Sequence, residues 1–137
     1  MTSVEAPITE AIIDSRKAIP GSLFIALQGE KTDGHQFVEK SFNQGASIAI
    51  ISKDINIGAH EVLDLRTEKN NEVKFTPDFP FCIRVENSLA AMQEIAKYWR
   101  KKLPIRVTGI TGSVGKSSTK ELVADVLSQK YHTFKNP

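Results

Sequence analysis

The chain has 137 residues, 40% hydrophobic and 25% charged, which is the balance of an ordinary globular protein with enough apolar residues for a core. Its 18 basic and 16 acidic residues are scattered, without the basic stripe and interleaved aromatic residues of nucleic-acid binders. No run approaches the roughly 18 apolar residues of a membrane span, no secretion signal is evident, and a single cysteine, Cys82, excludes an internal disulfide. We therefore expect a cytoplasmic protein with no nucleic-acid partner and no membrane span.

Residues 1–86 predict a small α/β domain. Short apolar runs bounded by glycine, proline and polar residues indicate strands, and Cys82 lies in one of them as a buried residue. A helix over residues 35–43 carries three apolar side chains on one face and ends before Gly45. Residues 53–78 are polar and are expected to be irregular. The expected strands are residues 8–13, 23–27, 47–51 and 81–85.

A second amphipathic helix follows. Asn87 is a favourable N-cap, and apolar residues recur at three- and four-residue spacing until Pro104 stops the helix. This apolar stripe, including Trp99, is expected to pack in a core. Because the helix leads directly into the next expected strand, we place a domain boundary near residue 86, with a second domain over residues 87–137.

A glycine-rich turn lies between an expected buried strand at residues 105–107 and an amphipathic helix that begins at Lys116. Glycines allow backbone N–H groups to approach phosphate oxygens, the helix N-terminus favours negative charge, and Lys116 can reach terminal phosphates. Ser117 offers a hydroxyl to Mg²⁺. The loop departs from the strict P-loop pattern, which has glycine in place of Ile110. The residues expected to bind the nucleotide are Gly112, Ser113, Val114, Gly115, Lys116, Ser117 and Ser118.

The alternative interpretation of this segment is an ordinary strand-to-helix turn with Lys116 as a solvated surface charge. After Lys116 only 21 residues remain (137 − 116), enough for one helix and the start of a strand. A doubly wound nucleotide-binding domain needs several more strand and helix units. We therefore expect the chain to be part of a longer protein, with a truncated P-loop domain at its end.

Two motifs resemble those of one known family. The segment from Thr111 to Ser118 reads T-G-S-V-G-K-S-S and resembles the ATP-binding loop of the Mur ligases, which build the peptide of bacterial cell-wall precursors. The segment from Asp14 to His35 contains Asp-Ser-Arg, Pro-Gly-Ser-Leu-Phe and Asp-Gly-His, and it resembles the uridine-binding domain of the same family. On these two motifs, in the family's order, the chain is identified as a member.

The resemblance implies an ATP-dependent ligase with ATP and Mg²⁺ as cofactors. Residues 1–86 would bind the UDP substrate, and residues 87–137 would begin the ATP-binding domain. The pairs Gly29-Glu30, Gly112-Ser113 and Lys120-Glu121 favour the branch that joins D-alanyl-D-alanine to UDP-N-acetylmuramoyl tripeptide through an acyl phosphate. The complete protein is expected to be a monomer.

The same resemblance assigns roles to individual residues. Lys116 would be the catalytic residue that offsets charge on the transferred phosphoryl group, and Ser15 with the loop residues Glu30, Lys31 and Thr32 would contact the uridine nucleotide. Ser15 bonding a turn and Lys31 as a solvated loop charge remain alternatives, as does an ion pair between Asp14 and Arg16. His35 is expected to pack at the start of a helix rather than to catalyse.

Three other functions remain open. A sister ligase of the family adds a diamino acid to the dipeptide precursor, and a non-catalytic module would bind a nucleotide or UDP-sugar without reacting. A P-loop kinase or GTPase would explain the glycine-rich loop but not the motif from Asp14 to His35. Only 13 residues precede Asp14, fewer than the family usually has, which leaves part of the uridine pocket unassigned.

Overall fold

The computed structural model describes residues 8–66 and 78–136. The chain divides into two compact units, of which the first ends at Lys102 and the second begins at Leu103. We call them the sheet unit and the loop unit and describe each by itself. Among the described residues, no helix combines the length and apolar character needed to cross a bilayer.

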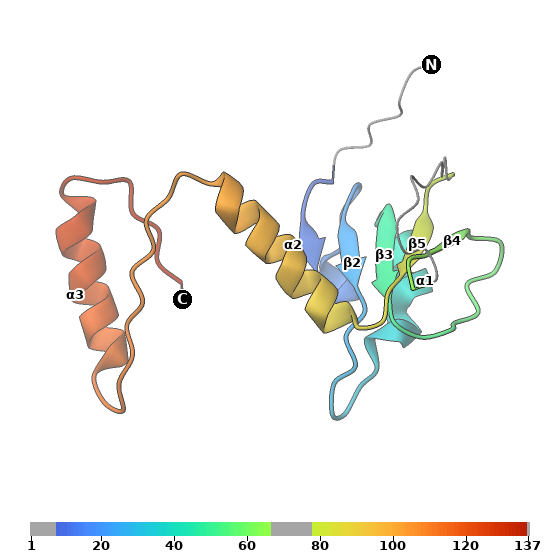
Figure 1. Cartoon of the computed structure of the whole chain (residues 1–137), viewed down its shortest axis with the longest axis horizontal. Helices are drawn as coiled ribbons and strands as arrows, with labels where there is room; N and C mark the ends of the chain where they lie inside the picture. The colour runs from blue at the N-terminus through green and yellow to red at the C-terminus, as the bar shows by residue number, and fades with distance from the viewer. Residues whose placement is uncertain (1–7, 67–77, 137) are drawn as a thin grey trace, which may run out of the picture. The chain divides into compact units, whose positions relative to one another are not determined.

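The sheet unit is built on a five-stranded parallel sheet with the strand order β1-β2-β3-β5-β4 (Figure 1). In the central register, Ile25 of β2 is paired with Ile50 of β3, and Ile50 with Ile83 of β5. Because every strand runs in the same direction, all five carboxyl ends lie at one edge of the sheet. The strands are β1 Ala11–Ile12, β2 Leu23–Ile25, β3 Ile48–Ile51, β4 Val62–Asp64 and β5 Phe81–Arg84.

The two helices expected over residues 35–43 and after Asn87 are confirmed, and both lie in the sheet unit. The first has a 3₁₀ turn, η2 (Gly34–Phe37), that leads into α1 (Val38–Asn43). The second is α2 (Ser88–Lys102), and the Asn87 side chain caps it by accepting a hydrogen bond from the Ala90 N–H at 3.0 Å. A further 3₁₀ turn, η1 (Ser15–Lys17), follows β1.

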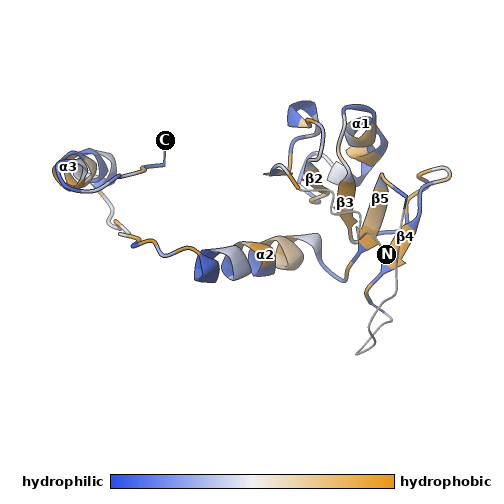
Figure 2. Cartoon of the chain, turned by 90° about the horizontal axis from the view of Figure 1, so that it is seen from above, coloured by the Kyte–Doolittle hydropathy of each residue, from blue (hydrophilic) through white to orange (hydrophobic). Residues whose placement is uncertain are grey.

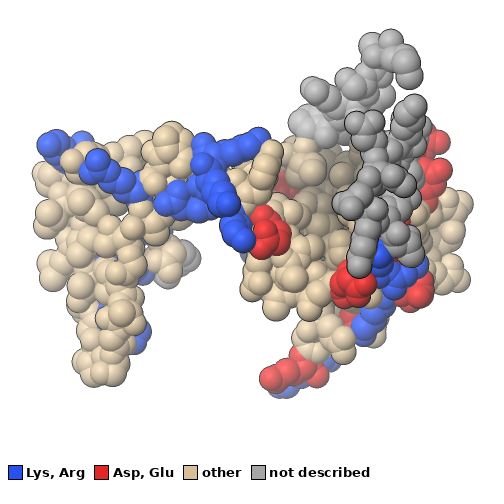
Figure 3. All heavy atoms as spheres, viewed as in Figure 1, with Lys and Arg blue, Asp and Glu red and all other residues tan. Residues whose placement is uncertain are grey.

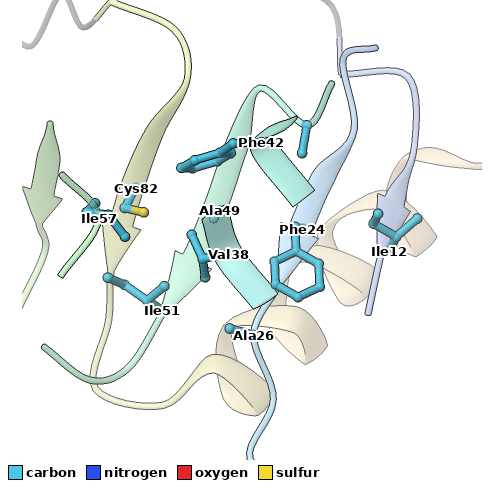
Figure 4. Packing of buried hydrophobic residues seen from close by; sticks show 10 residues of the cluster. Ile12, Phe24, Ala26, Val38, Phe42, Ala49, Ile51, Ile57 and Cys82 are labelled. Carbon is cyan, nitrogen blue, oxygen red and sulfur yellow. The ribbon is translucent and has the colours of Figure 1, made fainter. Parts of the chain in front are cut away.

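Alternating side chains of the sheet form a core on each face. Phe24, Ala49 and Ile51 lie on the face that packs against α1, where Val38 and Phe42 complete the cluster (Figure 4). On the opposite face, the cluster contains Leu23, Ile25 and Ile50, against which Ala91, Met92 and Ile95 of α2 pack. The sheet is therefore covered by a helix on both sides, and β1, β2 and β3 are wholly apolar rather than alternating with polar residues.

Cys82 belongs to the α1-side core, as expected for a strand residue, and its exposed fraction is 0%. Burial raises the pKa of its thiol to about 12. The thiol is therefore protonated at neutral pH and behaves as a small apolar group.

Only the first part of α2 contributes to the core. Met92 and Ile95 pack against the sheet, but Trp99 is 57% exposed and Leu103 is 47% exposed. The last turn is hydrophilic in Figure 2, and basic side chains gather over it in Figure 3. The expectation that Trp99 packs in a core is therefore wrong, because the helix extends past the sheet that covers its first turns.

The packing of α2 also bears on the boundary expected near residue 86. Since Ala91, Met92 and Ile95 share a cluster with β2 and β3, the structure groups the helix with the sheet unit, and the compact unit ends at Lys102. The helix nevertheless leads directly into the glycine-rich segment, which is the observation on which the expected boundary rested.

Two strand predictions are wrong. The segment expected to be irregular contains β4, whose three residues are half-buried beside β5; residues 67–77 of that segment lie outside the described part. Conversely, residues 105–107 are not a strand, and Ile105 and Val107 are 51% and 66% exposed. A strand needs a neighbour for its backbone hydrogen bonds, and residues 103–136 contain no other strand that could pair with it.

Candidate phosphate loop and substrate edge

The glycine-rich loop ends at α3 (Lys116–Ser128), which confirms the helix expected from Lys116 onward. Gly115 is the N-cap and has a φ of 77°, in the left-handed region that side chains rarely adopt. A Cβ atom at this position would meet nothing within 4 Å, so the requirement for glycine is conformational rather than steric. Gly115 turns the chain into the helix, and its carbonyl oxygen accepts the first helical hydrogen bond from the Thr119 N–H at 2.9 Å.

Lys116 folds back over the loop. Its ammonium group donates a hydrogen bond to the carbonyl oxygen of Gly112, four residues earlier. The side chains of residues 113–118 are all exposed. The loop therefore presents a cation and the unpaired N–H groups of a helix N-terminus on the same accessible segment, which is an arrangement that attracts anions.

The charges around the loop are compatible with a bound anion. The first turn of α3 contains no acidic residue that would oppose an anion, and the nearest one, Glu121, pairs with Lys120 at 3.7 Å and with Lys135. Ser117 would supply one hydroxyl ligand to Mg²⁺. Within residues 8–66 and 78–136, no group of three or more histidine, cysteine or acidic side chains is placed to hold a metal ion.

The residues expected to contact the uridine nucleotide follow β1 and β2, at the carboxyl edge of the sheet. Ser15 is in η1, directly after β1, and is 6% exposed. The ion pair between Asp14 and Arg16, which the sequence left as an alternative, is present at 2.8 Å. The side-chain and backbone hydrogen bonds from Arg16 lower the pKa of Asp14 to about 2. Ligands of open α/β sheets bind outside the carboxyl ends of the strands, which is where this corner lies.

The loop after β2 is a tight turn formed by residues 28–33, which we call the substrate turn. Its ends form an antiparallel bridge between Gln28 and Asp33, and the Gly29 N–H donates to the Thr32 carbonyl oxygen at 3.0 Å. Glu30, Lys31 and Thr32 are exposed, and the turn projects from the carboxyl edge of the sheet (Figure 1). The turn therefore holds its polar side chains available to a ligand at the same edge as Ser15.

A polar network that the sequence did not predict lies at the base of the substrate turn. His35 is 5% exposed, and its Nδ1 atom lies 2.5 Å from Oδ1 of Asp33, while its Nε2 atom accepts a hydrogen bond from the Ser52 N–H at 3.0 Å. Lys53 donates to Oδ2 of Asp33 at 2.7 Å. The expectation that His35 packs at the start of a helix is confirmed, but its partners on the β3 side were missed.

A pocket of about 330 Å³ adjoins this network. Its walls come from η2, from α1 and from the segment after β3, and they mix carboxylate, amide and apolar side chains with one lysine. Asp54 on its rim pairs with Arg84 at 2.5 Å, and Arg84 also contacts Asp64 at 3.3 Å, so the ends of β3, β4 and β5 are joined by ion pairs. The carboxyl edge is thus polar along its length, although its charges are largely paired.

The family follows from comparison with known proteins. The model of the Mur ligase family, catalytic domain, matches residues 7–100, which is more than half of the chain. The chain belongs to the Mur ligase family. The matched Mur ligase region ends before the glycine-rich loop, so it rests on the sheet unit with its substrate turn and not on the phosphate motif.

Individual Mur ligases are similar over most of the chain. The UDP-N-acetylmuramoyl-tripeptide--D-alanyl-D-alanine ligase of Synechocystis is 36% identical over 127 residues, 93% of this chain and 24% of its own length. The UDP-N-acetylmuramoyl-L-alanyl-D-glutamate--2,6-diaminopimelate ligase of Haemophilus ducreyi is 30% identical over 118 residues, 86% of this chain and 23% of its own length. The chain therefore spans about a quarter of the length of the curated relatives it matches.

The fold is also that of a solved Mur ligase. The crystal structure of MurF ligase from Thermotoga maritima in complex with ADP superimposes with a TM-score of 0.72 at 24% identity, and covers 98% of this chain and 27% of that one. The parallel α/β fold expected from the sequence is thereby confirmed.

Proposed function

We propose that the chain is the N-terminal part of an ATP-dependent ligase that joins D-alanyl-D-alanine to UDP-N-acetylmuramoyl tripeptide. The observation that carries this proposal is the similarity over nine-tenths of the chain to a relative named for that reaction. The sheet unit would bind the UDP substrate, and the glycine-rich loop would bind ATP with Mg²⁺. In the proposed reaction, the tripeptide carboxylate accepts the γ-phosphoryl group of ATP, and the dipeptide amine then displaces phosphate from the acyl phosphate.

The glycine-rich loop supplies the groups that phosphoryl transfer needs. Negative charge on the transferred group must be offset, and a lysine with oriented backbone N–H groups does so without any covalent step. Lys116 would exchange its bond to the Gly112 carbonyl oxygen for phosphate oxygens, while the N–H groups from Gly112 to Ser118 hold the β- and γ-phosphates. Ser117 would hold a magnesium ion through its hydroxyl group, and the ion would supply positive charge that offsets part of the phosphate charge.

The carboxyl edge of the sheet would hold the other substrate. Ser15 and the exposed residues of the substrate turn, Glu30, Lys31 and Thr32, provide hydroxyl, carboxylate and ammonium groups there. A uridine diphosphate has hydrogen-bond donors and acceptors on its base and ribose and negative charge on its phosphates, which these groups complement.

A second candidate is the sister ligase that adds a diamino acid to the UDP-dipeptide precursor. It is favoured by one observation, the 30% identity to the relative named as a 2,6-diaminopimelate ligase. The identities to the two relatives, 36% and 30%, are close, and both reactions would use the same loop and the same edge of the sheet. The two are therefore distinguished by substrate and not by the geometry of this chain.

The experiment is phosphate release from ATP by the full-length protein. UDP-N-acetylmuramoyl tripeptide and D-alanyl-D-alanine are added separately and together, and a parallel series uses the UDP-dipeptide precursor with a diamino acid. We expect release only when the tripeptide and D-alanyl-D-alanine are both present. Release with the parallel pair alone assigns the sister ligase, and background rates with both pairs leave a non-catalytic nucleotide or UDP-sugar binding module.

A further inference from the structure

The exposed tip of the substrate turn has few contacts of its own. Within the turn, the Gly29 N–H donates a hydrogen bond to the Thr32 carbonyl oxygen, and just outside it the Gly34 N–H donates to the Leu27 carbonyl oxygen at 2.8 Å. Glu30 and Lys31 are exposed at the tip. The direction in which the tip points is therefore fixed at its base, where Asp33 and Gly34 connect the turn to the rest of the sheet unit.

Gly34 brings the base of the turn against the end of β2. A Cβ atom at Gly34 would lie 2.7 Å from the Leu27 carbonyl oxygen and 2.8 Å from the Leu27 nitrogen, both of which are backbone atoms. No side chain fits in this space without moving the backbone. Asp33 and His35, on either side of Gly34, are thereby held beside the carboxyl end of the strand.

Asp33 and His35 are joined to the end of β3 by a closed ring of hydrogen bonds. Oδ1 of Asp33 accepts from the His35 N–H at 3.0 Å and faces its Nδ1 atom at 2.5 Å. Nε2 of His35 accepts a hydrogen bond from the Ser52 N–H. The proton of the neutral His35 imidazole therefore lies on Nδ1 and points at Asp33. Oδ2 of Asp33 accepts from Lys53, the residue after Ser52, at 2.7 Å.

The side chains that form this ring of hydrogen bonds differ in their exposure to solvent. The His35 side chain is 3% exposed and the Asp33 side chain 24%, so the bond between them is shielded from water. Lys53 first, and then His35, hold the pKa of Asp33 well below its ordinary value, which keeps the carboxylate charged at neutral pH. The Lys53 side chain is 42% exposed, so it can be changed without opening the core.

We propose that the ring of Asp33, His35, Ser52 and Lys53 is a positioning device that fixes the substrate turn in the orientation that binds the UDP substrate. These residues act through the turn and do not touch the substrate. The inference rests on the proposed function, since it takes the turn to be a substrate contact. Pre-organising a binding loop lowers the ordering cost of each binding event, so loss of the ring weakens binding without altering the phosphoryl-transfer groups.

The test compares two lysines in the full-length protein. Lys53→Gln removes one arm of the ring, whereas Lys40→Gln removes an exposed lysine of α1 that forms no ion pair with another described residue. In Lys53→Gln we expect the KM for UDP-N-acetylmuramoyl tripeptide to rise about fivefold. The kcat and the KM for ATP should stay within about twofold of the wild-type values. Lys53→Arg should restore the KM, and Asp33→Asn should raise it further.

A second measurement reads the turn directly, without any ligand. Amide hydrogen exchange at Gly29 and Gly34 should accelerate in Lys53→Gln and not in Lys40→Gln. An unchanged KM, equal effects of the two lysine variants, or faster exchange spread over the whole sheet unit would overturn the inference. If the wild-type protein binds no UDP substrate, the proposed function fails instead, and the exchange rates alone decide whether the ring holds the turn.

Discussion

Lys116 donates a hydrogen bond from its ammonium group to the carbonyl oxygen of Gly112, across the glycine-rich loop. The lysine is therefore already positioned over the segment that would hold phosphate, and its partner is a neutral carbonyl group that an anion readily displaces. A hydrogen bond to a charged acceptor is roughly twice as strong as one to a neutral acceptor, so Lys116 would bind a phosphate oxygen in preference to the Gly112 carbonyl oxygen.

Replacing Lys116 with alanine should lower the rate of phosphate release by about 10²–10³, since it removes a cation that acts on charge developing in the transition state. Lys116→Arg should recover little, because a planar guanidinium does not reproduce a compact ammonium group. Lys101→Ala, at an exposed position in the last turn of α2, is the matched control and should leave the rate unchanged. Equal activity of the two alanine variants would refute a catalytic role for Lys116.

Gly115 offers a test of loop geometry that leaves the charge of the loop unchanged. Alanine at a φ of 77° costs roughly 1–2 kcal/mol, so Gly115→Ala should raise the dissociation constant for ATP about tenfold. Gly109→Ala is the matched control, because an added Cβ atom meets nothing within 4 Å there and the residue does not have a positive φ. Nucleotide titration of both variants measures the difference, and a Gly115→Ala affinity equal to that of Gly109→Ala would contradict the requirement for left-handed backbone.

Phe24 tests the core that supports the substrate edge. Its side chain is 1% exposed and lies in the α1-side core, so Phe24→Ala should lower the free energy of unfolding by about 3–5 kcal/mol. Ile13, the residue after β1, is 59% exposed, so Ile13→Ala should change the free energy of unfolding by less than about 0.5 kcal/mol. Urea denaturation measures both. A loss below about 1 kcal/mol in Phe24→Ala would mean that the observed packing does not stabilise the sheet.

Acid should destabilise the sheet unit partly through Asp14. Its pKa is lowered from 3.8 to about 2, first by the side-chain bond to Arg16, so the folded state favours the charged carboxylate. The contribution to stability is present above pH 3.8 and is lost as the pH falls toward 2. As the pH falls from 3.8 toward 2, the unfolding midpoint of Asp14→Asn should therefore decrease less steeply than that of the wild-type protein. Glu61→Gln, an exposed carboxylate with no ion pair to a described residue, is the control, and an equally shallow decrease in both variants would remove Asp14 as the cause.

Several elements were predictable because their signal is local. The central strands are short apolar runs, and α2 and α3 have clear helical spacing with Asn87 and Gly115 at their first turns. The edge strand β4 was missed because it has only three half-buried residues and charged residues lie beside them, so the sequence contains no apolar run that would predict a strand there. The prediction of a strand at residues 105–107 failed for the converse reason, since a segment with β-branched residues forms no strand where no partner strand lies beside it.

The candidate site was predictable to a smaller extent. The types and order of Ser15, Glu30, Lys31 and Thr32 could be read from the motif, and parallel strands explain why their loops share an edge. The ring around Asp33 could not be read from the motif. Ser52 lies 17 residues after His35, and only the register of β2 against β3 brings the two together.

The burial of Cys82 has a practical consequence. It is the only cysteine in the chain, and its thiol is sealed within the core with a pKa of about 12, so thiol reagents should leave the folded protein unmodified. Within this chain, a cysteine introduced at the exposed position of Lys31 would then be the reactive thiol. A fluorescent or spin label could be attached at the tip of the substrate turn without first replacing Cys82, and the movement of that tip on ligand addition could be followed spectroscopically.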